Sequence, residues 1–156
     1  MAKRIWITWE NQRRNRTLSN ALKAVLFELD VRSNKFVRYL ISVAKTLTVF
    51  IKEKPDLLFV SNPSMLLAFL SVIYGKVFKL PVVVDAHNAG LYPSEVGKRW
   101  ANRLANYLIR NANITIVTNE YLAKHVFNKG GRPFVLPDPI PQFGEANNLN
   151  SRKNLS

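Results

Sequence analysis

The residues with the clearest chemical potential lie in the stretch VVVDAHNAG, at positions 82–90. An apolar run ends there in an acid, an imidazole and an amide, which are Asp85, His87 and Asn88. Histidine titrates near neutral pH, so His87 could act as a general base, contact a sugar hydroxyl or donate to a phosphate. Asp85 precedes it by two residues, on the same side of an extended strand, and could orient the imidazole. The structural alternative is that Asp85 caps the following loop and His87 packs against an aromatic ring.

A second cluster, ENQRRNRT at positions 10–17, places Arg13, Arg14 and Arg16 where a crossover helix is expected to begin. Positive charges at a helix N-terminus oppose the helix dipole unless an anion binds there. The cluster therefore favours a phosphate or a lipid head group near Arg13 and Arg14. The alternative is a solvated basic turn.

These residues need elements to position them, and hydrophobic periodicity predicts short strands alternating with longer helices. The predicted strands cover residues 5–9, 26–31, 56–61, 80–86, 114–118 and 133–137. The predicted helices cover residues 17–25, 35–54, 62 to about 78, a segment sharing Val96, Trp100, Leu104 and Leu108 on one face, and 120–127. This alternation predicts an α/β fold, a Rossmann-like parallel sheet with right-handed crossovers and helices on both faces.

In an open parallel sheet, ligands collect beyond the carboxyl ends of the strands. The polar residues that follow each predicted strand are therefore candidate binding residues. Besides the two clusters above, they include Asn62 after the third strand, and Asn119 and Glu120 after the fifth.

The segment 35–54 is the most regular of the predicted helices. Its apolar residues recur every three or four positions and its other residues include several lysines. A basic amphipathic helix suits a membrane surface. We nevertheless expect the domain core to account for most of its apolar face.

The composition limits the classes of function. The chain of 156 residues is the size of one domain, and its net charge of +13 implies an anionic partner such as nucleic acid, an acidic membrane or a phosphorylated substrate. With no cysteine and two histidines, no metal site is expected. The basic residues are spread over several helices without an RNA-binding motif, so nucleic acid is not favoured. The N-terminus lacks the apolar core of a signal peptide, so we expect a cytoplasmic protein.

The order of elements and three stretches resemble the N-terminal, acceptor-side domain of GT-B glycosyltransferases of the family 4 type. The stretches are KPDLLFVSNPSMLLAFLSVIYGKVFKLPVVVDAHN, ANITIVTNEYLAKHV and FVLPDPIP. The resemblance covers residues 4 to about 141, which we take as the Rossmann-like domain, and residues 142–156 read as a polar linker or tail.

The resemblance implies transfer of a sugar from a nucleotide-sugar donor to an acceptor, without a metal or other cofactor, in glycan or polysaccharide biosynthesis. It places Asp85 and His87 at the strand end near the reacting centre, with Asn88 beside them. Asn119 and Glu120 fall on a turn that lines the interdomain cleft. The acceptor would be a glycan or a lipid-linked phosphate, used at the inner face of the membrane.

Two departures from the family pattern affect what the chain can do. Residues 10–13 stand where many members have a Gly-Gly loop, and the chain ends at Ser156, where the donor-binding domain would begin. We therefore expect the donor to bind mainly on a second domain, supplied by a donor-domain subunit or a longer gene product, and this chain alone to be inactive. The alternative function is a non-catalytic basic module that binds an anionic polymer or a membrane surface.

Overall fold

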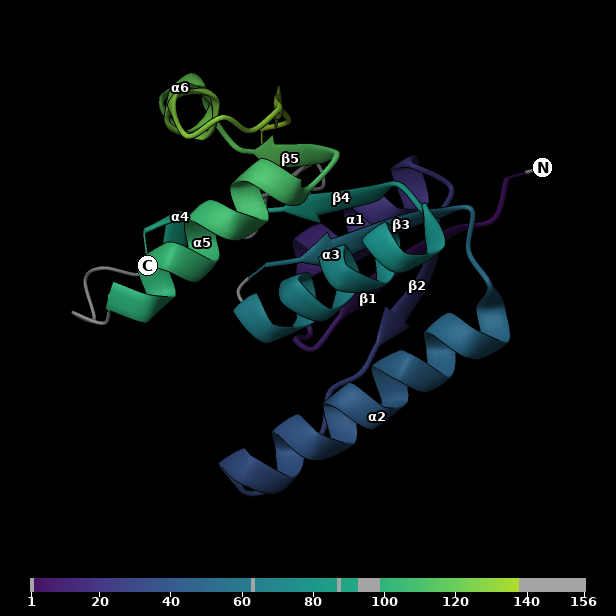
Figure 1. Cartoon of the computed structure of the whole chain (residues 1–156). Coiled ribbons are helices and arrows are strands. Elements are labelled where there is room, and N and C mark those ends of the chain that lie inside the picture. The colour runs from purple at the N-terminus through teal and green to yellow at the C-terminus, as the bar shows by residue number, and fades with distance from the viewer. Residues whose placement is uncertain (1, 63, 87, 93–98, 138–156) are drawn as a thin grey trace, which may run out of the picture.

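The computed structural model describes residues 2–62, 64–86, 88–92 and 99–137. Strands and helices alternate along this part of the chain (Figure 1). The strands are β1 (Arg4–Thr8), β2 (Val25–Glu28), β3 (Leu57–Ser61), β4 (Val82–Asp85), β5 (Ile114–Val117) and β6 (Pro133–Val135). The helices are α1 (Arg13–Ala21), α2 (Lys35–Glu53), α3 (Met65–Phe78), α4 (Asn88–Leu91), α5 (Arg99–Asn111) and α6 (Glu120–Asn128).

The six strands form one parallel sheet in the order β2-β1-β3-β4-β5-β6. The predicted Rossmann-like α/β fold is therefore confirmed. The chain runs outward to β2 on one side of β1 and then builds β3 to β6 on the other side. The strand order thus reverses between β1 and β3, which is the position where doubly wound sheets bind ligands.

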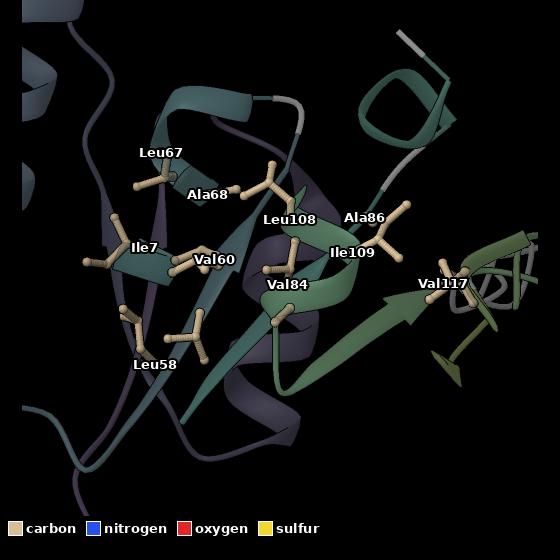
Figure 2. Close-up of a cluster of buried hydrophobic side chains, with 14 of the residues drawn as sticks. Ile7, Leu58, Val60, Leu67, Ala68, Val84, Ala86, Leu108, Ile109 and Val117 are labelled. Carbon is tan, nitrogen blue, oxygen red and sulfur yellow. The ribbon is translucent and has the colours of Figure 1, made fainter. Parts of the chain in front are cut away.

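The larger core lies between the sheet and the layer of α2, α3 and α5. Strand residues facing this layer, such as Ile7, Val60 and Val84, are buried against Leu67 of α3 and Leu108 of α5 (Figure 2). β3 and β4 are buried on nearly all positions, as expected for parallel strands covered on both faces.

The opposite face of the sheet is covered by α1, which Figure 1 shows on the far side from α3. A smaller cluster forms there, in which Trp6 stacks on Phe59 with ring centroids 5.5 Å apart and Leu18 of α1 packs against them. The smaller cluster ends at the carboxyl ends of the strands, where polar side chains follow it.

The first crossover differs from the prediction of a helix over 17–25 and a strand over 26–31. The helix begins at Arg13 and ends at Ala21, and the strand begins at Val25. The arginine-rich segment is helical because Arg14 and Asn15 are buried against the sheet rather than exposed in a turn. Periodicity missed this segment because a buried arginine does not register as an apolar position.

The expectation that core packing explains most of the apolar face of α2 is wrong. This helix contacts the rest of the molecule through Ser42, Thr46 and Phe50, which are buried, whereas Phe36 and Leu40 are largely exposed. Phe50 stacks on Tyr74 of α3 at 4.3 Å between ring centroids. Two small polar residues allow the helix backbone to approach the protein, so the apolar stripe faces outward.

The remaining boundaries agree with the predictions within a few residues. Ser64 caps α3 by accepting a hydrogen bond from the Leu67 amide at 3.4 Å. No helix in the described ranges is both long and apolar enough to cross a membrane. The predicted tail, residues 142–156, lies outside the described residues.

Candidate functional site

A row of three polar side chains crosses the carboxyl ends of neighbouring strands. Ser61 of β3 pairs in register with Asp85 of β4, and Thr8 of β1 follows the registered pair of Ile7 and Val60. Side chains alternate along a strand, so all three point away from the larger core and toward α1. Each is at most 1% exposed. Such burial requires partners, and α1 supplies them to Asp85 and Thr8.

Arg14 of α1 forms a buried ion pair with Asp85. Its Nε lies 3.1 Å from Oδ2 of the carboxylate and its Nη2 lies 2.9 Å from Oδ1. Nη2 also donates to the Leu136 carbonyl at 3.1 Å, which joins α1 to the end of β6. The two side chains are 7% and 1% exposed, so this pair is shielded from water. Removing either partner would leave the other charge buried without its counter-ion, which is costly. The pair therefore holds α1 firmly against the strand ends.

Asn15 completes the contact between α1 and the row. Its Nδ2 donates to Thr8 Oγ1 at 3.0 Å, and Thr8 Oγ1 in turn accepts from the Glu10 amide at 3.1 Å. Three buried atoms near this point lack a hydrogen-bond partner among the described residues, namely Asn15 Oδ1, Ser61 Oγ and Asn62 Oδ1. Buried polar atoms nearly always find a partner, so these atoms mark a place suited to a polar ligand or ordered water.

Asn62 lies directly beyond β3 and is 2% exposed. Its backbone amide donates to the Asp85 carbonyl at 2.9 Å, which extends the pairing of β3 and β4. Gly90 of α4 lies against it so closely that an added Cβ would come within 2.3 Å of the Asn62 carbonyl oxygen. The VVVDAHNAG segment therefore needs a glycine at its end, because α4 packs directly on Asn62.

The arginine cluster of α1 is used mainly for internal contacts. Arg14 binds Asp85, and Arg16 binds the Glu28 carboxylate of β2 with two hydrogen bonds of 3.0 Å. The Glu28 hydrogen bond and charge raise the pKa of Arg16 above its ordinary value. Protein carboxylates thus supply the anions for two of the three arginines, and Arg13 is exposed at the first helical position.

The other predicted residues that the structure describes lie along the same edge of the sheet. His87 lies outside the described residues, so its predicted pairing with Asp85 stays a prediction. Asn88 is exposed at the start of α4. Asn119 caps α6 by accepting from the Leu122 amide at 3.0 Å, and Glu120 is exposed in the first turn of that helix, where its charge suits the dipole.

A small pocket at the point of strand reversal was not predicted from the sequence. It has a volume of about 80 Å³. Its lining comes from the end of β1, the N-terminal half of α2 and the residue before α3, and consists of Trp9, Glu10, Arg38, Tyr39, Ser42 and Ser64. Arg38 and Tyr39 belong to a helix far from β1 in sequence, so no local motif could indicate that they meet Trp9.

The pocket combines aromatic rings with charged groups. The Trp9 and Tyr39 rings lie 6.0 Å apart, and Arg38 lies over the Tyr39 ring at 5.5 Å. Trp9 Nε1 donates to Thr46 Oγ1 at 2.9 Å, which fixes the indole against α2. Aromatic faces suit the C–H surface of a sugar ring, Glu10 can accept from hydroxyl groups, and Arg38 can pair with a phosphate.

The second histidine packs against an aromatic ring. His125 of α6 contacts the Tyr92 ring at 4.4 Å between centroids. Burial lowers the pKa of His125, and the nearby positive charge of Lys129 lowers it further. Burial also raises the pKa of Tyr92, together with its hydrogen bond and charge interaction with Tyr121. Among the described residues, no group of three acidic, histidine or cysteine side chains could hold a metal ion.

Solved structures of three proteins share the fold of this chain. Anabaena HepE in complex with UDP and glucose has a TM-score of 0.56 and 14% identity, over 90% of this chain and 45% of that chain. S. aureus MnaA with UDP has a TM-score of 0.54 and 14% identity, over 86% and 44%. Glycyrrhiza uralensis UGT73P12, complexed with glycyrrhetinic acid 3-O-monoglucuronide, has a TM-score of 0.51 and 10% identity, over 83% and 41%.

No family model and no curated protein matches the sequence. The chain spans less than half the length of each of the three structures. At these identities the likeness concerns the fold, and it supports the predicted GT-B type for this chain. The finer assignments, to family 4 and to the N-terminal acceptor side, stay predictions. The described chain has a Rossmann-like fold that resembles one half of a GT-B structure.

Proposed function

We propose that this chain is the acceptor-binding half of a glycosyltransferase, which transfers a sugar from a nucleotide-sugar donor to an acceptor. The donor binds mainly on a second Rossmann-like domain, held by a partner subunit or a longer product. HepE and MnaA were both solved with UDP, so UDP-sugars are the first donors to test. The proposal assigns the pocket at the strand reversal to the acceptor.

The observation that carries this proposal is the chemistry gathered at the carboxyl edge of the sheet. The pocket presents Trp9 and Tyr39 beside Glu10 and Arg38, as sugar and phosphate recognition require. The buried row at the same edge of the sheet offers an oxygen without a hydrogen-bond partner among the described residues, Ser61 Oγ. Both features lie where doubly wound folds bind ligands.

We assign the catalytic role to His87, which follows β4 by two residues in the sequence, as a general base or a group that stabilises charge at the reacting centre. Asp85 precedes it and is held by Arg14 through two short contacts. This ion pair anchors the end of β4 against α1. Arg13, Asn62, Asn88, Asn119 and Glu120 line the same edge and are assigned to substrate binding.

A lipid-linked phosphate fits the acceptor site better than a neutral glycan. Arg38 lines the pocket, and it belongs to α2, whose outer face is apolar. A phosphate bound at Arg38 would place its lipid chain along that face. This arrangement corresponds to an enzyme of polysaccharide biosynthesis in peripheral contact with the inner face of the membrane.

The test begins with the partner. The chain would be tagged in its native cell, purified with its associated proteins and supplied with radiolabelled UDP-sugars and a total membrane lipid extract. We expect a co-purifying chain with a second Rossmann-like domain, and label transferred to a lipid-extractable product. If neither is found with any UDP-sugar, the glycosyltransferase proposal is wrong.

Variants of the active complex separate the two sites. His87→Ala is expected to lower kcat about a hundredfold with little change in KM for the acceptor, because it acts in the chemical step. Trp9→Ala is expected to raise the acceptor KM about tenfold, because it removes part of the pocket wall. Phe127→Ala, at an exposed site on α6, serves as the control and should leave both constants unchanged.

A further inference from the structure

The outer face of α2 is an exposed apolar surface. We define this face by Phe36, Leu40, Leu47 and Ile51, which are 73%, 57%, 42% and 68% exposed. With 3.6 residues per turn, these four residues fall within about 60° of the helix circumference. Val37 and Ile41 are also exposed and widen the apolar arc on one side. The helix therefore presents a continuous apolar strip along its length.

A row of basic residues borders this arc. Arg38, Lys45 and Lys52 are spaced seven residues apart, which is about two turns, so they form a straight line along the helix. All three are exposed. The single acidic residue of α2, Glu53, is neutralised by Lys3, whose Nζ lies 2.7 Å from its Oε2. The helix thus combines an apolar strip with an uncompensated positive edge.

The apolar surface continues past the end of α2. A groove of about 580 Å³ lies between the C-terminal ends of α2 and α3, and Ile51 belongs to both the strip and the groove. Tyr74 and Phe78 contribute aromatic walls, and the charged side chains of its lining are Lys54, Lys79 and one acid, Asp56. The groove repeats the combination of apolar wall and positive charge.

We propose that the outer face of α2 docks on an anionic lipid bilayer, with the helix axis in the plane of the membrane. The apolar strip enters the boundary between head groups and acyl chains, and the row of Arg38, Lys45 and Lys52 contacts lipid phosphates. A helix of 19 residues is roughly 28 Å long, which provides several turns of contact without crossing the bilayer.

The charge argues against a second copy of this chain as the occupant. Two copies meeting through α2 would bring their basic rows together, with no free carboxylate on either helix to pair with them. The whole chain carries a net charge of +13, so the repulsion extends beyond the helix. An acidic lipid surface meets the same row with attraction.

Docking through α2 would locate the membrane contact of the proposed function on this helix. It rests on the proposed function only for its biological setting. Vesicle binding requires no donor, acceptor or partner chain, so its failure would leave sugar transfer standing. Equally, a chain that fails to support transfer can still bind vesicles. The two experiments therefore fail separately.

The first test is co-sedimentation with vesicles of phosphatidylcholine alone and with an equal mixture of phosphatidylcholine and phosphatidylglycerol. We expect binding to the mixed vesicles and little binding to the neutral ones. The double variant Phe36→Ser/Leu40→Ser should weaken binding at least about tenfold, because it removes two apolar groups from the lipid boundary.

The control pair is matched in exposure. Phe127 and Phe134 are 71% and 54% exposed, close to the values for Phe36 and Leu40, but they belong to α6 and β6. Phe127→Ser/Phe134→Ser should therefore bind vesicles as the unaltered chain does. If both double variants lose binding equally, adhesion is non-specific and the proposal is wrong.

The charge row has its own variant. Lys45→Gln/Lys52→Gln should lower binding to the mixed vesicles by roughly fivefold per residue and make it less dependent on salt. Lys23→Gln/Lys124→Gln, at exposed sites off this helix, should change it less. Sedimentation velocity without lipid completes the test. The proposal is overturned if the chain ignores mixed vesicles, or if it self-associates through a contact that Phe36→Ser/Leu40→Ser abolishes.

Discussion

The helices on the two faces of the sheet are attached by opposite means. α1 is bound to the strand ends by arginine–carboxylate pairs, one of them buried between Arg14 and Asp85. α2 contacts the molecule through Ser42, Thr46 and Phe50 and leaves its apolar strip exposed. At α1 the charged side chains make contacts within the molecule, whereas at α2 the apolar side chains are exposed and can contact an external partner. A helix's composition therefore does not by itself say which of its residues face inward.

This contrast explains how the edge of the sheet can serve as a site. The buried pair and the Asn15–Thr8 hydrogen bond fix α1 over the carboxyl ends of β1 and β4. The N-terminal half of α2 then completes the pocket with Arg38 and Tyr39. The pocket is therefore lined by Trp9 and Glu10 just after β1, by Ser64 before α3, and by the helix that we assign to the membrane.

The largest expected effect comes from breaking the buried pair. Arg14→Met should lower the free energy of unfolding by about 3–5 kcal/mol, because it leaves the Asp85 carboxylate buried without its guanidinium. Urea denaturation of the purified chain measures the change. Arg14→Met/Asp85→Leu should recover part of it. Arg16→Met, at the more exposed pair, is the control, and an equal loss there would contradict the contrast between buried and exposed pairs.

The next effect compares two apolar positions on α2. Phe50→Ala should cost about 3 kcal/mol, because its ring is fully buried and stacked on Tyr74. Leu40→Ala should change stability by less than about 0.5 kcal/mol, because that side chain is mostly exposed. The urea denaturation midpoints of the two variants measure both changes in stability. Similar losses would mean that the outer face of α2 is covered in solution.

A smaller effect tests the role of Asn119. Asn119→Ala should destabilise the chain by about 1 kcal/mol, because the Leu122 amide loses its cap. Asn119→Asp keeps the cap and should leave stability nearly unchanged. Thermal melts give both values. If Asn119→Asp keeps stability but lowers transfer in the active complex, the side chain also contacts substrate, as we propose.

The smallest effect depends on pH. Because the pKa of His125 is lowered in the folded chain, the unfolded chain binds the proton first as the pH falls. The contribution of neutral His125 is therefore present above its unfolded pKa, near 6.5, and is lost as the pH drops through the folded value. His125→Gln should reduce the fall in Tm between neutral and mildly acidic pH. An identical fall in both proteins would show that other groups cause it.

The sequence was sufficient for the fold because strands and helices alternate with clear periods. The all-parallel sheet, the crossover helices and the strand ends bearing Asn62, Asp85 and Asn119 were all predicted. The length of α2 was also predicted, within one residue. These features depend on local pattern, which a single chain displays directly.

The reversed roles of α1 and α2 could not be predicted, because they depend on contacts distant in sequence. Arg14 and Asp85 are separated by 71 positions, so neither residue signals the other. On α2, periodicity identified an apolar stripe but not the direction it faces. Ser42 and Thr46 indicate which face of the helix packs on the protein, because small polar residues at helical spacing allow close approach.

Site-specific labelling can determine whether α2, and not α1, docks on the membrane as we propose. The chain has no cysteine, so Leu40→Cys on α2 and Asn20→Cys on α1 each accept one fluorescent label. Mixed phosphatidylcholine and phosphatidylglycerol vesicles would carry a quencher on their acyl chains. We predict strong quenching of the label at position 40 and little at position 20. Equal quenching at both positions, or quenching at position 20 alone, would show that the outer face of α2 is not the docking surface.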